Sequence, residues 1–174
     1  METLSLSKTG LSINPDELGK LQSLKTLFLK GGYQLDFSAF PTLPNLTTLY
    51  VWNEDFDDFS FLSRLPSLKK LSIVSCSLSD YETTIETWPA LPGLTTLQIC
   101  SSDFLNLDFL EETTGLETLD IFNCFELDDV SMLNELENLK SVRVNDEGEG
   151  YQSWVDEQID EFAENSPSSC WVGN

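Results

Sequence analysis

The chain has 174 residues, of which 30 are Asp or Glu, 9 are Lys or Arg and none is His, so its formal net charge is −21. Nucleic acids are held through their phosphates by clustered basic side chains, and so few basic residues cannot supply that field. The same charge disfavours anionic membrane surfaces, and no apolar run reaches the about 20 residues of a membrane-spanning helix. We therefore expect neither a nucleic acid nor a membrane as a partner.

The composition also argues against catalysis. Hydrophobic residues make up 40% of the chain, which is enough for one sizeable core, but the absence of His removes the commonest general base and zinc ligand. Four scattered cysteines show neither a disulfide framework nor a CxxC motif, and Met1 leads into polar sequence without the pattern of a secretory signal. We expect a cytoplasmic protein that is not an enzyme and needs no cofactor or metal.

One apolar pattern returns along nearly the whole chain. Six-residue segments (hexads) that are apolar at their first, fourth and sixth positions begin at Met1, Leu24, Leu46, Leu68, Leu94, Leu116 and Leu139. Successive starts are 22 to 26 residues apart. The alternation at the end of each hexad is typical of a half-buried strand.

A second apolar residue follows each hexad near the eleventh position, as at Phe56, Leu78 and Phe104, before a return segment such as FSFLSRLPSL. These features resemble the leucine-rich repeat family, in its 22-residue, internalin-like bacterial variety, over about residues 1 to 145. The resemblance implies an α/β solenoid with about seven parallel strands on the concave side and short helical turns on the convex side. Stacking is also what the physics demands, because one unit cannot bury its own leucines.

We divide the chain into a solenoid over residues 1–150 and a C-terminal helical cap and tail over residues 151–174. The segment SWVDEQIDEFAEN has the pattern of an amphipathic helix, while Trp171 either folds back on the last repeat or stays free. The first hexad begins at Met1, which predicts an open edge strand. A truncated chain, a dimer through that edge and protection by polar side chains all remain open, and so does the oligomeric state.

Several positions depart from the family pattern. The ninth position, where the family prefers Asn, holds Thr9, Gly32, Glu54, Cys76, Ser102 and Cys124, which weakens a continuous asparagine ladder. Cys76 and Cys124 are two repeats apart, about 10 Å at the usual strand spacing, so we expect buried thiols and no disulfide. Cys100 falls on the concave face and should be more accessible. The fourth repeat has four extra residues, which we expect to bulge outward with Tyr81 and Trp88.

Acidic clusters offer weak evidence for chemistry. The segment NEDFDD at residues 53–58 lacks the Gly and the distant Glu of a calcium loop, and the repeat core needs its Phe56. The carboxylates of Glu117 and Asp120 have no nucleophile, base or phosphate loop to act with. We therefore expect a solvated turn in the first case and no active site in the second.

Strand alternation places the third and fifth residues of each hexad, with the seventh and eighth residues that follow, on the concave face. Phe28, Tyr50 and Trp52 occupy adjacent strands there, and aromatic residues are enriched at binding hot spots. We predict that these three, with Asp120 and Phe122 further along, contact a partner. The alternative is that the aromatic rings stack on one another, or on a capping segment outside this sequence.

The acidity is unevenly distributed. Residues 1–70 carry a charge of −1 and residues 71–174 a charge of −20, part of it on the expected cap helix at Asp156, Asp160 and Glu164. Such a field steers basic molecules, so we include these three among the partner-binding residues and expect a basic protein partner. One function that fits is a bacterial immunity protein that neutralises a toxin. The alternative is an adaptor or a structural fragment of a larger repeat protein.

Overall fold

The computed structural model describes residues 1–7, 14–31, 36–78, 80, 86–102, 104, 106–124, 127, 129–145 and 171–173. Each of the seven hexads forms a five-residue strand that runs from its third to its seventh position. These strands are β1 (Thr3–Ser7), β2 (Thr26–Lys30), β3 (Thr48–Trp52), β5 (Lys70–Val74), β7 (Thr96–Cys100), β8 (Thr118–Phe122) and β9 (Ser141–Asn145).

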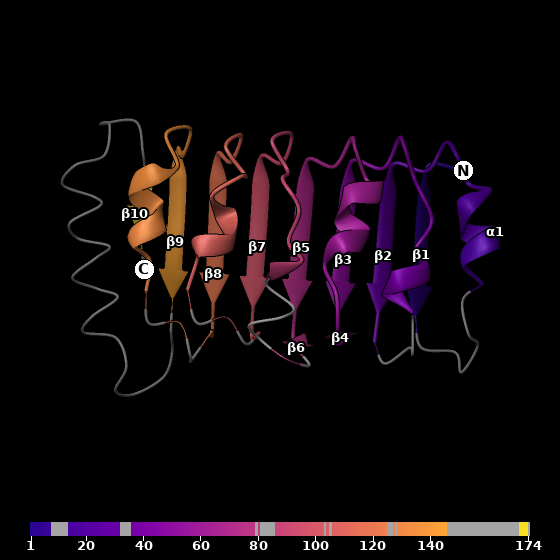
Figure 1. The fold of residues 1–174 in the computed structure, drawn as a ribbon, viewed down its shortest axis with the longest axis horizontal. Helices are drawn as coiled ribbons and strands as arrows, with labels where there is room; N and C mark the ends of the chain where they lie inside the picture. The colour runs from indigo at the N-terminus through magenta and orange to yellow at the C-terminus, as the bar shows by residue number, and fades with distance from the viewer. Residues whose placement is uncertain are drawn as a thin grey trace.

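All seven strands pair in parallel, in sequence order, and equivalent repeat positions lie opposite one another (Figure 1). The short strand β10 (Trp171–Gly173) adds to β9 as an eighth member of the sheet, also in parallel. The seven predicted strands are therefore confirmed, and the backbone of the tail extends the sheet at its C-terminal edge.

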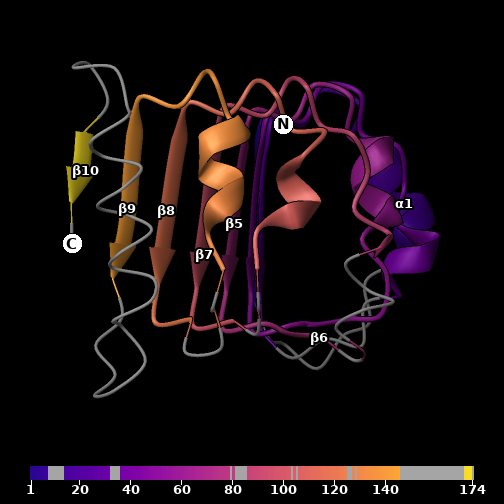
Figure 2. The ribbon, with the colours of Figure 1, turned by 60° about the vertical axis from the view of Figure 1, so that its left-hand side comes forward.

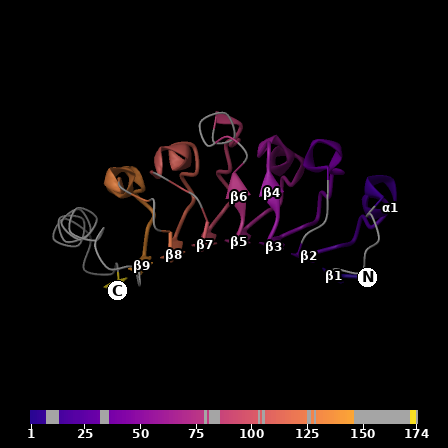
Figure 3. The same cartoon turned by 90° about the horizontal axis from the view of Figure 1, so that it is seen from below.

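The return segments lie on the outer side of the arc, and the strands line its inner, concave side (Figure 3). They contain α1 (Pro15–Gly19) and the 3-10 turns η1 (Phe37–Ala39), η2 (Ser60–Arg64), η3 (Asp108–Leu110) and η4 (Ser131–Glu135). The strands β4 (Asp55–Phe56) and β6 (Ser77–Leu78) pair beside them. Figure 2 shows the strands from the side, all pointing the same way. The predicted layout of strands and helical turns is confirmed.

The core lies between these two layers. The fourth and sixth hexad positions are buried from β2 to β8, as alternation requires. On the convex side, phenylalanines pack ring against ring, with Phe56 at 4.7 Å from Phe59 and at 5.0 Å from Phe37 between centroids. Stacked repeats therefore share one continuous core, which no single repeat could form.

The insertion in the fourth repeat contributes to this core. Trp88 is half-buried, and its ring lies 5.0 Å from that of Phe59 and 4.7 Å from that of Phe109 between centroids. Its indole therefore closes the convex side where the repeat is longer. Tyr81, the other aromatic residue expected on the bulge, lies outside the described residues.

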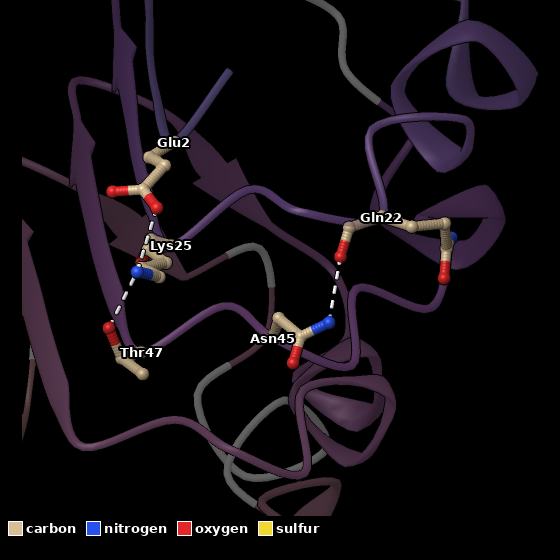
Figure 4. A network of polar contacts seen from close by, with 5 residues as sticks. All are labelled: Glu2, Gln22, Lys25, Asn45 and Thr47. Carbon is tan, nitrogen blue, oxygen red and sulfur yellow. Dashed lines mark hydrogen bonds and ion pairs between the residues drawn. The ribbon is translucent and has the colours of Figure 1, made fainter.

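Side chains tie the amino ends of neighbouring strands together (Figure 4). The Thr47 hydroxyl donates to the carbonyl of Lys25 at 3.1 Å, and the amide of Asn45 donates to the carbonyl of Gln22 at 2.8 Å. The Lys25 ammonium also forms an ion pair of 2.8 Å with Glu2. These bonds join residues one repeat apart, so they fix the register of the solenoid.

The carboxyl ends of the strands turn through a repeated backbone conformation. Two residues after each of five hexads, at the eighth position counted from the hexad's start, the backbone has a positive φ. These residues are Gly31, Asn53, Ser75, Ser101 and Asn123. At each of the first four, the N–H donates to the last carbonyl of the next strand at 2.7 or 2.8 Å. This turn takes the chain out of the sheet and points the ninth residue inward.

The ninth position is buried at Glu54, Cys76, Ser102 and Cys124. The Ser102 hydroxyl accepts the N–H of Cys76 at 3.2 Å and donates to the carbonyl of Cys100 at 3.0 Å, so it links two repeats without an asparagine. Burial raises the pKa of the Cys76 thiol to about 11. Cys76 and Cys124 are buried free thiols and Cys100 is half-buried, as predicted.

Of two other predictions, the structure confirms one and does not reach the other. The turn at residues 53–58 buries Phe56 completely in the repeat core, as expected. The expected cap helix falls on residues that the structure does not describe. Within the described part of the chain, no helix is long and apolar enough to cross a membrane.

Candidate functional site

The concave face presents three rows of residues that cross the strands, because equivalent hexad positions pair in register. The third positions form the row Thr3, Thr26, Thr48, Lys70, Thr96, Thr118 and Ser141. The fifth positions form the row Ser5, Phe28, Tyr50, Ser72, Gln98, Asp120 and Arg143. The seventh positions form the row Ser7, Lys30, Trp52, Val74, Cys100, Phe122 and Asn145.

Side chains of the middle row contact one another in pairs. The rings of Phe28 and Tyr50 stack at 4.5 Å between centroids, with 2° between their planes. The Ser72 hydroxyl donates to the side-chain carbonyl of Gln98 at 2.9 Å. Asp120 and Arg143 form a third pair, so six of the seven side chains of this row contact another member of the row.

That third pair joins Asp120 to Arg143. The guanidinium Nε and one terminal nitrogen each donate to a different carboxylate oxygen at 2.7 Å. Hydrogen bonding to Asp120 raises the pKa of Arg143. The Asp120 side chain is nearly buried, so its charge is compensated inside the sheet and is not free to attract a partner.

Two lysines lie over the aromatic rings at the other end of the face. The Lys30 ammonium lies 5.9 Å from the ring centroids of both Phe28 and Trp52, and the Lys70 ammonium lies 5.5 Å from that of Tyr50. At such distances the ring quadrupole attracts the cation. We call these five residues, Phe28, Lys30, Tyr50, Trp52 and Lys70, the aromatic–lysine surface.

The row at the carboxyl ends of the strands is the least polar. Trp52 is 51% exposed, and among the described residues only Met1 is another large hydrophobic residue with such exposure. Val74, Cys100 and Phe122 follow it on the next three strands and are half-buried. The Arg143 guanidinium lies 5.4 Å from the Phe122 ring centroid. An apolar strip therefore extends across four strands, with a cation at either end.

Comparison with solved structures shows two leucine-rich repeat proteins with this architecture. An internalin from Listeria monocytogenes matches 83% of the chain with a TM-score of 0.53 and 15% identity. Human 5T4, a trophoblast glycoprotein, matches 98% of the chain with a TM-score of 0.57 and 20% identity. The chain has the leucine-rich repeat fold.

The likeness concerns the fold. This chain spans 48% of the length of the internalin chain and 75% of the length of the 5T4 chain. No family model matches its sequence, and no curated protein matches it.

The structure brings together three of the residues predicted to contact a partner. Phe28, Tyr50 and Trp52 are adjacent, as expected, and two of them also stack on each other, which was the alternative. Phe122 lies three strands from Trp52 on the same leucine-rich repeat sheet, and Asp120 is bound by Arg143. The acidic residues expected on the cap helix, Asp156, Asp160 and Glu164, lie outside the described residues.

Sequence reasoning missed the cations. Lys30 and Arg143 occupy the same concave positions as the selected aromatic residues, and Lys70 occupies the third position on the same face, so the repeat register was a signal that could have found them. On the described concave strands, these three positive side chains outnumber the one negative side chain, that of Asp120. Most of the described acids are elsewhere, and exposed examples on the return segments include Glu111, Glu112, Glu135 and Glu137.

The described residues offer no metal chemistry. No group of three or more Cys, Asp or Glu side chains among them could hold a metal ion. The concave leucine-rich repeat face presents rings, alkyl groups, hydroxyls and cations, which suits binding.

Proposed function

We propose that the chain is a non-enzymatic protein-interaction module that binds its partner on the concave face. The observation that carries this proposal is the exposure of Trp52 beside the Phe28–Tyr50 stack on a rigid sheet. A half-exposed tryptophan on a regular sheet offers a large apolar area to a partner, and tryptophan is enriched at interface hot spots. The leucine-rich repeat fold of the two similar proteins supports a binding role in general.

We further propose that the partner is a basic protein. Support comes from the charge of −20 over residues 71–174, since a field of one sign accelerates the encounter with molecules of the opposite sign. In the specific form of this proposal, the chain is a cytoplasmic immunity protein, and the partner is a toxin whose basic active-site cleft it blocks.

An alternative role is that of an adaptor segment in a larger leucine-rich repeat protein. It is supported by the length comparison, because the chain spans about half of the internalin chain that it matches. A toxin gene beside this one would favour immunity, whereas repeats encoded in frame with it would favour the larger protein.

The test uses the tagged full chain to isolate partners from a lysate of the source organism, with identification by mass spectrometry. Calorimetry with the purified partner then compares wild type with Trp52→Ala, Trp52→Phe and the convex-face control Glu135→Ala. Because hot-spot truncation removes 2 kcal/mol or more, we expect Trp52→Ala to weaken binding by about 30-fold. Trp52→Phe should lose less, and Glu135→Ala should bind like wild type.

All these variants should unfold at the temperature of the wild type, because the substituted side chains are exposed. Equal affinity of wild type and Trp52→Ala would show that binding does not use this surface.

A further inference from the structure

The aromatic–lysine surface has a charge opposite to that of the whole chain. Lys30 and Lys70 lie over the three rings, so a partner cation would meet like charge at the ring faces where a cation is normally bound. A partner anion would instead meet two ammonium groups that the rings help to hold in place. The local chemistry thus selects an acidic group.

No carboxylate neutralises these two lysines among the described residues. The ion pairs there join Lys20 to Glu17, Lys25 to Glu2, Lys140 to Glu117 and Arg143 to Asp120. In β1, β2, β3 and β5, every concave position is Thr, Ser, Val, Lys or aromatic. The two ammonium groups therefore remain available to a ligand.

The acids among the described residues do not cancel this local charge. The Debye length is about 8 Å at physiological salt. Asp120 on β8 is two strands from β5, which carries Lys70; this is about 10 Å at a strand spacing of 4.8 Å, before the offset along the strands is added, and Asp120 is already paired with Arg143. Asp55 follows the turn at Asn53, where the chain has left the concave sheet for β4.

We propose that the aromatic–lysine surface binds an extended acidic segment of a protein partner, with carboxylates at Lys30 and Lys70 and an apolar side chain on Trp52, which lies directly beside Lys30. Lys30 and Lys70 are two strands apart and differ by four positions along the strand. Their Cα atoms are therefore about 16 Å apart, the length of about five residues in an extended chain. The matching motif is two acidic residues about five positions apart, with an aromatic or aliphatic residue next to one of them.

This inference rests on the proposed function and narrows it. A partner that is basic overall would approach the acidic half of the solenoid and insert one acidic loop at the aromatic end. The partner would then be basic overall with one acidic loop, whereas this chain is acidic overall with one basic surface.

The probe is a displayed library of random decapeptides, selected in parallel on the wild-type full chain and on three variants. These are Trp52→Ala, the double variant Lys30→Gln with Lys70→Gln, and the control Lys25→Gln with Lys140→Gln. Both double variants remove two positive charges, but the control lysines belong to ion pairs at the amino ends of strands. Thermal unfolding confirms that each variant is folded.

We expect the wild type and the control to enrich the same acidic, aromatic-containing peptides. Synthetic copies of these peptides should bind the Lys30/Lys70 variant at least tenfold more weakly and the control within twofold of wild type. Peptides that need Trp52 but are basic or neutral would overturn the acidic segment and leave the interaction function standing. The absence of any peptide that needs Trp52 would count against both.

Aromatic residues interleaved with lysines also occur in single-strand nucleic-acid sites. A fluorescent single-stranded oligothymidine therefore competes with the best peptide in the same assay. If it binds more tightly than the peptide and with the same dependence on Lys30 and Lys70, the protein-segment proposal is wrong. The net charge of −21 leads us to expect no displacement.

Discussion

Phe28 and Tyr50 stack face to face on neighbouring strands, with their ring centroids 4.5 Å apart. The pair occupies equivalent positions of consecutive repeats, so the stack is a direct product of the in-register sheet. It forms a fixed wall beside Trp52, which is itself half-exposed. The three aromatic residues thus divide into two that support the surface and one that is available to a ligand.

A double-mutant cycle tests this division. Phe28→Ala and Tyr50→Ala should each destabilise the fold, with a coupling energy of about 0.5–1.5 kcal/mol, the range for aromatic pairs beyond their area burial. Urea denaturation of the four proteins gives the coupling energy. A cycle that combines Tyr50→Ala with Lys140→Ala, a distant exposed position, should be additive. If the Phe28–Tyr50 cycle is additive too, the stack contributes nothing to stability.

Two glycines in equivalent positions should respond differently to the same substitution. A Cβ at Gly115 would lie 2.2 Å from the carbonyl oxygen of Pro92. A Cβ at Gly93 would lie 3.7 Å from its nearest neighbour, the carbonyl oxygen of Leu68. The clash at Gly115 is with backbone, which cannot rotate away. We expect Gly115→Ala to lower the free energy of unfolding by about 2 kcal/mol or more, as overpacking does, and Gly93→Ala to change it by less than about 1 kcal/mol.

Urea denaturation measures both glycine variants. Equal stabilities would mean that the backbones of the fourth and fifth return segments do not approach each other as closely as the structure shows.

The eighth-position turn predicts a stabilising substitution. Ser75 has a φ of 52°, a conformation that glycine and asparagine adopt more readily than serine. The third and sixth repeats already hold Asn53 and Asn123 at this position. Ser75→Asn should therefore stabilise the fold by about 0.5–1 kcal/mol, within the cost of a left-handed residue. Ser77→Asn, an exposed position in β6, is the control and should bring no gain in denaturation experiments.

The repeat predicted much of this fold because each hexad carries its own local pattern. Leu49 and Val51 alternate with Tyr50 and Trp52, and that alternation alone assigns one pair to the core and the other to the concave face. The contact of Asp120 with Arg143 needed a second step, the comparison of equivalent positions in neighbouring repeats. The positions of Lys30 and Lys70 over the rings depend on side-chain rotamers, which no periodicity contains.

Cys76 predicts a loss of stability at alkaline pH. Burial raises the pKa of its thiol from 9.0 to about 11 in the folded protein. Between these values the unfolded chain releases the proton and the folded chain keeps it, so rising pH favours unfolding. Two pKa units correspond to about 3 kcal/mol, lost progressively from pH 9 to 11. Denaturation across this range should show a smaller decline in Cys76→Ala, while Cys100→Ala should decline like wild type.

The position of the acidic charge, and not only its total, should control the rate of association with a basic partner. Reversing Glu111 and Glu112 to Lys changes the acidic half, and reversing Asp16 and Glu17 to Lys changes the other half by the same amount. All four side chains are exposed, and both variants move the net charge from −21 to −17. Steering depends on local potential, so the first variant should bind the partner more slowly at low salt.

Surface plasmon resonance at low and high salt separates the two variants. We expect a several-fold lower association rate for the Glu111/Glu112 variant at low salt, a smaller change for the Asp16/Glu17 variant, and convergence at high salt, where charges further apart than a Debye length are screened. Equal slowing by both variants would mean that net charge alone matters. Unchanged rates in both would contradict a basic partner.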